Sequence, residues 1–203
     1  KQLGNNDVLA EMIERASMSM LQRALLTIES WLNDLPPSLL RTRSGLLSIR
    51  GAITYMKGNP QEGLNLLNQA EESLQQAKND FGLILTLSRR ATAYRFLGGY
   101  AASLHDADEV LQLTETHDEY QMFYAEALRV KGLALYRLGQ ARQAVEFLEH
   151  SLNLYINLND TSSIPILFME TGIVYGAIGN YAEAGASYEK ALLIWRQVGH
   201  LSW

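Results

Sequence analysis

Cysteine is absent from this sequence of 203 residues. The chain therefore has no disulfide framework, no thiolate metal site and no thiol nucleophile. It also lacks an apolar run of the roughly 18 residues that a membrane-spanning helix needs, and its N-terminus lacks a signal-peptide core. From these absences we expect a cytoplasmic protein that does not enter a membrane.

An excess of positive charge is missing too. The sequence has 17 basic and 22 acidic side chains, a formal net charge of −5, and no cluster of Lys and Arg. Binding to a phosphate backbone relies on such a cluster, because the counterions that it releases supply much of the binding free energy. We therefore expect no direct nucleic-acid binding by this chain.

Motifs for catalysis and metal binding are lacking as well. The sequence contains neither a GxxxxGK[ST] loop, which would cradle phosphates, nor a GxSxG nucleophile motif. The four histidines are His105, His117, His150 and His200. They form neither HExxH nor a pair four residues apart, and a solvated helix face explains Asp106, Asp108 and Glu109 better than a metal site does. We expect a protein that is not an enzyme, with no catalytic residue, cofactor or metal.

Proline is scarce, which favours long helices. Pro36, Pro37 and Pro60 fall at expected helix junctions, and Pro165 falls where the start of a helix tolerates proline. Apolar residues recur at helical spacing, and no run with a period of two argues for a strand. After a first helix that begins at residue 7, helices are expected over about 24–35, 43–57, 61–78, 81–97, 100–116, 120–138, 141–158, 163–178 and 181–198.

The first two helices have the weakest turn signal. The first helix is expected to bury one apolar stripe, made of Val8, Met12, Ile13 and Ala16. Only Gln22-Arg23 stands between it and the second helix, with neither Gly nor Pro to mark a turn.

A repeat of about 40 residues runs through the rest of the chain. Glycines expected at the turns recur at steps of 40, 41 and 40 residues, namely Gly58, Gly98, Gly139 and Gly179. Mostly small residues recur at matched offsets: Gly51, Ala91, Gly132 and Gly172 seven before each turn, Gly63, Ser103, Ala144 and Ala184 five after it, and Ala70, Val110, Ser151 and Ala191 twelve after it. Small residues at these places let two antiparallel helices approach closely.

Residues 172–191, GIVYGAIGNYAEAGASYEKA, match the tetratricopeptide-repeat pattern, although the step exceeds the roughly 34 residues of the usual unit. We therefore predict an all-α fold, a right-handed superhelix (an α-solenoid) of about five antiparallel hairpins with a concave groove. The predicted single domain covers residues 1–203, with hairpins at about 7–40, 43–79, 80–118, 119–160 and 161–200.

The segment from Trp31 to Arg43, WLNDLPPSLLRTR, resembles the WLxxLPxxLLRxR segment of MalT-type regulators, the ATP-dependent bacterial transcription activators of the LuxR group. One departure is Gln22-Arg23-Ala24, where that family usually has a Gly in the first turn. The resemblance implies a sensor domain that binds an inducer or partner proteins, with an ATPase module before it and a helix-turn-helix module after it. Since the sequence contains neither module and stops directly after a repeat, we expect a fragment of a longer chain.

The groove predicts where a partner or effector binds. In tetratricopeptide hairpins the first helix lines the concave side, so the repeat register selects Ser48, Tyr55, Ser88, Thr92, Arg95, Arg129 and Tyr136 as candidate groove residues. Two arginines, Arg95 and Arg129, are suited to hold an anionic group, and Tyr55 and Tyr136 to stack on a ring or sugar. Further along the stack the groove turns apolar. The alternative is that these are ordinary solvated residues of the first helices.

Three basic residues occupy one register position, directly before the small residue of the first helix. They are Arg50, Arg90 and Lys131, and we call them the basic ladder. One interpretation is that their long stems cover the boundary between repeats while their charges reach solvent. The other is that they engage an acidic segment of a partner.

Three functions fit these observations. The leading one is a non-catalytic sensor and protein-interaction domain of a transcriptional regulator, with an effector or partner protein in the groove. The alternative is a general tetratricopeptide scaffold for complex assembly, unrelated to transcription. The third is a spacer that self-associates through exposed solenoid ends.

Overall fold

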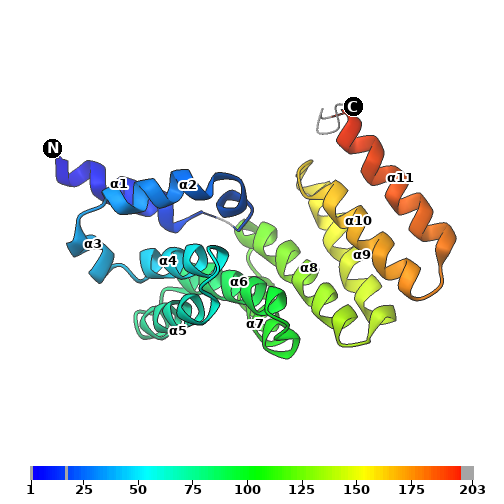
Figure 1. The fold of residues 1–203 in the computed structure, drawn as a ribbon, viewed down its shortest axis with the longest axis horizontal. Helices are drawn as coiled ribbons and strands as arrows, with labels where there is room; N and C mark the ends of the chain where they lie inside the picture. Colours follow the sequence, from blue (N-terminus) through cyan, green and yellow to red (C-terminus); the bar gives the residue numbers. More distant parts are fainter. Residues whose placement is uncertain (1, 17, 198–203) are drawn as a thin grey trace. The chain divides into compact units, whose positions relative to one another are not determined.

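A computed structural model describes residues 2–16 and 18–197, and all regular elements in these ranges are helical. The chain divides into two compact units, residues 1–98 and 99–203. The first unit contains α1 (Gln2–Glu14), α2 (Met18–Asp34), α3 (Pro37–Thr42), α4 (Ser44–Met56), α5 (Pro60–Gln76) and α6 (Asp80–Phe96) (Figure 1). The second contains α7 (Tyr100–Thr114), the 3-10 helix η1 (Asp118–Tyr120), α8 (Gln121–Arg137), α9 (Ala141–Asn157), α10 (Ile164–Ala177) and α11 (Tyr181–Gln197).

Tight turns at the predicted glycines separate the helices of each pair. Gly58 has φ +94° and Gly139 has φ +84°, backbone conformations that residues with a Cβ rarely adopt. Pro60 then opens α5 at its first position, where its missing N–H is not needed. The turns therefore end one helix and start the next within three residues, as the repeat predicts.

Close helix contact explains the small residues at the matched offsets. A Cβ on Gly51 of α4 would lie 2.9 Å from the carbonyl oxygen of Gly63, and a Cβ on Gly63 of α5 would lie 2.7 Å from that of Gly51. In the second unit, a Cβ on Gly132 of α8 would lie 2.8 Å from the Leu148 side chain of α9. The prediction of closely packed antiparallel helix pairs is confirmed.

Apolar residues at helical spacing form the cores of the second unit. Ala144, Val145, Leu148, Leu152 and Tyr155 of α9 are buried. Their partners on α8 and α10 include Leu135, Val174 and Leu167, and Ala141 is half-buried at the start of the same stripe. The all-α fold of tetratricopeptide-like hairpins is confirmed, whereas the single domain over residues 1–203 stays a prediction.

The first hairpin differs from the prediction. Helix α1 ends at Glu14 and α2 already begins at Met18, whereas Ala24, where the second helix was expected to begin, is a kink inside α2 with φ −128° and ψ 30°. Val8 and Met12 are each 59% exposed, so they do not belong to the buried stripe. Ile13, and Ala16 just after α1, are buried as expected, and Ala10 rather than Val8 or Met12 joins them in the core.

Helix α3 was not predicted, and it lies in the segment that resembles MalT-type regulators. Pro37 opens it, and Leu39 and Leu40 pack partly buried against the core of the first unit. Arg43, directly after it, donates from Nη2 and Nε to the two carboxylate oxygens of Glu14, at 2.6 and 3.1 Å. This pair ties the α3–α4 junction to the end of α1. Among the described helices, none is both long enough and apolar enough to cross a membrane.

Candidate functional site

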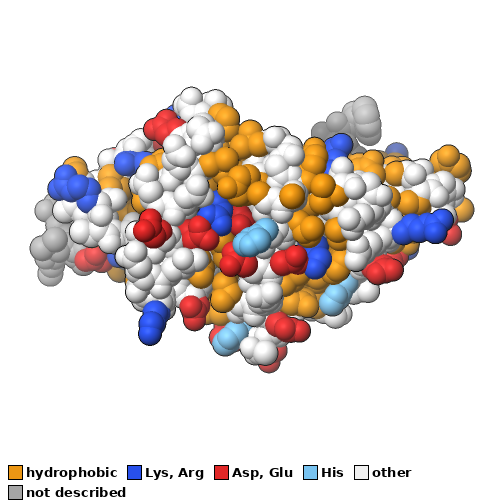
Figure 2. Space-filling model, turned by 90° about the horizontal axis from the view of Figure 1, so that it is seen from below, with side chains coloured by type: hydrophobic (Ala, Val, Ile, Leu, Met, Phe, Trp, Pro, Cys, Tyr) orange, Lys and Arg blue, Asp and Glu red, His pale blue; other side chains and the backbone are white. Residues whose placement is uncertain are grey.

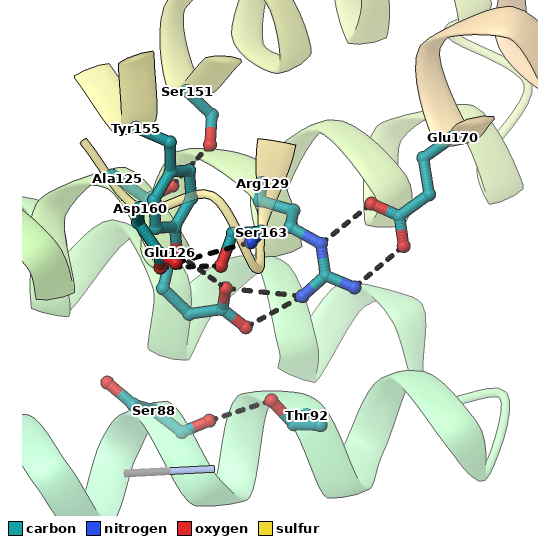
Figure 3. A network of polar contacts seen from close by, with 10 residues as sticks. All are labelled: Ser88, Thr92, Ala125, Glu126, Arg129, Ser151, Tyr155, Asp160, Ser163 and Glu170. Atoms are coloured by element: carbon teal, nitrogen blue, oxygen red, sulfur yellow. Dashed lines mark hydrogen bonds and ion pairs between the residues drawn. The ribbon is translucent and has the colours of Figure 1, made fainter. Parts of the chain in front are cut away.

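Arg129, a predicted groove residue of α8, is enclosed by carboxylates of its own unit (Figure 3). Its Nε and Nη2 donate to the two oxygens of Glu170 on α10, each at 2.7 Å. Its Nη1 donates to Glu126 at 2.9 Å, and the Tyr155 hydroxyl donates to the same carboxylate at 3.0 Å. Burial alone would lower the pKa of Arg129, but Glu126 and Glu170 outweigh it and raise that pKa. An anionic ligand here would have to displace a carboxylate, and the binding role of Arg129 stays a prediction.

Ser48, the matching groove residue of α4, is fully buried in the first unit. Its hydroxyl accepts a hydrogen bond from Arg89 Nη1 at 2.8 Å and one from the Thr86 hydroxyl at 2.9 Å. Arg89 Nη2 also donates to the carbonyl oxygens of Glu14 and Ala16, at 2.7 and 2.8 Å. Arg89 thus binds the backbone at the end of α1 to α4 and α6.

The Arg89 guanidinium is only 1% exposed and forms no direct ion pair among the described residues. Burial lowers its pKa to about 9, against the opposing charge of Glu14. Three neutral oxygens accept hydrogen bonds from Nη1 and Nη2 of this buried cation, whereas its buried Nε has no hydrogen-bond partner within the described residues.

These two networks occupy the same places in the repeat. Ser48 and Arg129 each stand three residues before the small residue of their first helix, and Arg89 and Glu170 each stand two residues before theirs. Each pair is separated by 41 residues in the sequence. We call the pairs Ser48–Arg89 and Arg129–Glu170 the polar seam, because in each unit they join successive first helices.

Two further groove residues bond to their own helix. The Ser88 hydroxyl donates to the Ile84 carbonyl at 2.7 Å, and the buried Thr92 hydroxyl donates to the Ser88 carbonyl at 3.0 Å. Local bonds of this kind are usual for Ser and Thr inside helices.

The groove residues Tyr55 and Arg95 both lie in the first unit, and each is half-buried. Burial raises the pKa of the Tyr55 hydroxyl to about 12, and the charge of Arg95 opposes that rise, which places the two side chains within electrostatic reach. The Arg95 guanidinium lies 4.3 Å from the ring centroid of Phe96, which is 61% exposed. We call Tyr55, Arg95 and Phe96 the Tyr55–Arg95 surface. In the second unit the half-buried Tyr136 has Arg137 at 5.6 Å from its ring centroid.

Two members of the basic ladder are paired within the fold. Arg90 Nη2 donates to Glu71 at 3.0 Å, and its Nη1 donates to the same carboxylate and to Asn68. Lys131 Nζ donates to Asp108 at 2.6 Å and lies 4.5 Å from the Phe147 ring centroid. Arg50 is exposed. In agreement with such pairing, acidic and basic side chains are interspersed on the face that Figure 2 shows.

The structure groups His105, Asp106 and Glu109, whose ligand atoms lie within 4.8 Å of one another. Asp108, which is their neighbour in sequence, points instead to Lys131. Asp106 is buried and Glu109 is half-buried, so the expectation of a solvated helix face is wrong for Asp106. The expected absence of metal and cofactor stays a prediction.

Sequence reasoning missed the residues of the two networks around Ser48 and Arg129. Arg89, Glu126, Glu170 and Tyr155 were not selected as site residues. Arg89 and Glu170 share one register position, so comparing polar residues across the repeats at that position would have found them.

Two family models described as tetratricopeptide repeat match the sequence, one over residues 82–157 and the other over residues 171–194. No curated protein matches it at a significant level.

Among solved structures, the chain is similar to aspartyl phosphate phosphatase F from Bacillus subtilis, with TM-score 0.71, 13% identity, and coverage of 96% of this chain and 50% of that one. It is similar to the apo form of RapI, with TM-score 0.67, 18% identity, and coverage of 89% and 50%. It is also similar to the TPR-like repeats of a candidate kinesin light chain from Podosopora anserina, with TM-score 0.65, 18% identity, and coverage of 98% and 97%.

The chain thus spans only 50% of the length of the first two of these structures. At such low identities the likeness concerns the fold alone. Together, the matched repeats and the paired helices support a tetratricopeptide-like helical-repeat domain.

Proposed function

We propose that this chain is a non-catalytic protein-interaction domain that binds a partner through the Tyr55–Arg95 surface. Tetratricopeptide repeats support a protein-interaction scaffold. Tyr and Arg are also the residue types that most often dominate binding energy at protein interfaces.

The observation that carries this proposal is the contact of the Arg95 guanidinium with the exposed Phe96 ring, with Tyr55 within electrostatic reach. The repeat register selects both Tyr55 and Arg95, four residues after the small residues of α4 and α6, and the charge of Arg95 acts on the Tyr55 hydroxyl. The guanidinium lies against Phe96, so an exposed ring and a cation share one surface. A partner segment with an aromatic or acidic side chain fits this chemistry.

A finer proposal is that the domain is the sensor of a MalT-type transcriptional regulator. The Trp31–Arg43 segment favours it, since its leucines pack into the core and its last arginine binds Glu14. A general scaffold unrelated to transcription is equally consistent with the fold. The gene that encodes the chain separates them: a P-loop ATPase before residue 1 and a helix-turn-helix after residue 203 support the regulator, and flanks without either contradict it.

Site-specific photocrosslinking in the host cell tests the interaction surface. The photoreactive residue benzoylphenylalanine replaces Phe96, or, as an aromatic control, Tyr181 of α11, which is 77% exposed. We expect one protein adduct that forms from position 96 and does not form from position 181. This adduct should be lost when Arg95→Ala is added. Equal yields from both positions, or no adduct at position 96, would contradict the proposal.

A further inference from the structure

Arg50 differs from the other two members of the basic ladder. For Arg90 and Lys131, the second helix of the preceding hairpin supplies the carboxylate, Glu71 from α5 and Asp108 from α7. Arg50 lies on α4, and the second helix of the hairpin before it is α2. Within residues 2–16 and 18–197, no hydrogen bond or ion pair engages its side chain.

The repeat register explains this difference. Arg90 binds Asn68 and Glu71, and counting 40 residues back from them gives Ile28 and Trp31. Ile28 is buried in the core and Trp31 is 41% exposed, and neither side chain contains an oxygen atom. The first hairpin thus keeps the cation of the ladder but replaces its internal acceptors with apolar side chains.

Arg50 instead faces a cavity of about 250 Å³ between α2, α4 and the start of α5. Buried Leu32 and Ile53 form an apolar part of its lining, and the polar part includes Lys57 and Glu29. Lys57 Nζ binds Glu29 at 2.7 Å, so these two charges compensate each other. The guanidinium of Arg50 is therefore the cation of this cavity that is open to a ligand.

We propose that the Arg50 cavity binds a carboxylate of a protein segment, in the way that Arg90 binds Glu71 within the fold. Guanidinium and carboxylate match geometrically and form charge-assisted hydrogen bonds. The apolar lining favours a carboxylate carried on an apolar segment, such as a glutamate flanked by leucines. The cavity shares no residue with the Tyr55–Arg95 surface, and the inference does not depend on the function proposed for that surface.

Glu62 makes the site selective. It lines the same cavity from the first turn of α5, and within the described chain it forms no ion pair. Its negative charge repels a ligand of high charge density, such as inorganic phosphate, more strongly than a single carboxylate. Glu62→Gln should therefore tighten the binding of an acidic peptide, whereas Arg50→Gln should weaken it.

Peptide titration followed by NMR tests the proposal. The Arg50 Nε–H resonance of the ¹⁵N-labelled chain, assigned by its loss in Arg50→Gln, is followed at about 0.15 M salt, where surface charges are screened beyond about 8 Å. The probe is the blocked peptide acetyl-Leu-Glu-Leu-amide, and its matched control contains Gln in place of Glu. We expect a saturable shift with the Glu peptide only. For Arg50→Gln, the affinity obtained from backbone amide shifts should be at least about tenfold weaker. Equal shifts with both peptides, or equal affinity of Arg50→Gln, would overturn the proposal.

A second variant supplies the carboxylate from within the chain. Trp31→Glu places a carboxylate at the register position of Glu71 and should abolish peptide binding, whereas Trp31→Gln, which removes the same ring, should retain it. Arg142→Gln, an exposed residue of α9, is the matched charge control and should bind like the wild type. Retained binding in Trp31→Glu would contradict the proposal. Titrations with sodium acetate and with phosphate show whether the apolar segment or the charge alone is recognised.

Discussion

The Arg129 guanidinium of α8 holds the Glu170 carboxylate of α10 with two parallel hydrogen bonds, each of 2.7 Å. In the first unit, Arg89 of α6 holds Ser48 of α4 across the same separation of 41 residues. The repeat thus conserves the place of a polar contact between successive first helices while its chemistry changes. In one unit the contact is an ion pair, and in the other a buried cation held by neutral oxygens.

The ion pair of the polar seam predicts a strong coupling. Glu170→Ala leaves part of the Arg129 charge without a partner and should lower the free energy of unfolding by about 2–4 kcal/mol, because an uncompensated charge stays partly buried. The double variant Arg129→Ala/Glu170→Ala should cost less than the sum, with a coupling of about 1–3 kcal/mol. Urea unfolding measures both, with exposed Glu189→Ala as control. Additive losses would show that the pair does not act as a unit.

Arg89 should stabilise the first hairpin through the carbonyl oxygens of Glu14 and Ala16. Arg89→Met removes the buried charge but leaves these acceptors without a donor, so we expect a net loss of about 1–3 kcal/mol. Hydrogen exchange should show the loss first in α1 and α2. Lys has no planar fork to reach all three acceptors, and Arg89→Lys should not restore stability. Full rescue by Lys would contradict this account.

The matched glycines should differ in their tolerance of a methyl group. Gly63→Ala would press against backbone atoms of Gly51 and Tyr55, each 2.7 Å away, which cannot move without separating α4 from α5. We expect a loss of about 1–3 kcal/mol there. At Gly172, the three atoms nearest to an added Cβ all belong to the Tyr188 ring, which is partly exposed and can shift.

Gly185 is the control for these substitutions, because nothing lies within 4 Å of a Cβ placed there. Gly185→Ala should stabilise α11 by about 0.5–1 kcal/mol, since Ala restricts the unfolded chain. Thermal unfolding gives the order of the three variants. If Gly63→Ala were as stable as Gly185→Ala, helix contact would not be the reason for the small residues.

Tyr155 should make the second unit sensitive to alkali. Burial, and next the charge of Glu126, raise the pKa of its hydroxyl. Its contribution to stability is therefore complete below the unfolded pKa of about 10 and is lost as pH rises above that value. The difference in unfolding free energy between the wild type and Tyr155→Phe should fall by about 1.4 kcal/mol per pH unit above about pH 10. If the difference in unfolding free energy stayed constant above about pH 10, the pKa of the Tyr155 hydroxyl would not be raised in the folded state.

Local sequence signals were sufficient to predict the helix boundaries of the repeated hairpins, whereas contacts between distant residues determine the boundary of α1. Gly58 and Pro60 mark a turn by their own backbone preferences, so the boundary of α5 was predictable from a few residues. The end of α1 was not predictable in this way, because Arg89, more than 70 residues away, binds the carbonyl oxygens of Glu14 and Ala16 there.

The same limit applies to the candidate site. The repeat register placed Ser48 and Arg129 on the first helices, but their bonds to Arg89 and Glu170 depend on how neighbouring helices are rotated. The binding role of Tyr55 and Arg95, selected by the same register, stays a prediction.

The binding affinity of the protein captured from position 96 tests the central claim most directly. Isothermal titration calorimetry compares the wild type with Arg95→Ala and with Tyr55→Leu, which keeps an apolar side chain at that position. Gln69→Ala, on the exposed side of α5, is the control. We predict that the first two weaken binding at least about tenfold, roughly 1.4 kcal/mol each, while the control and all melting temperatures stay unchanged. Unchanged affinity in both variants would contradict the claim that this surface binds the partner.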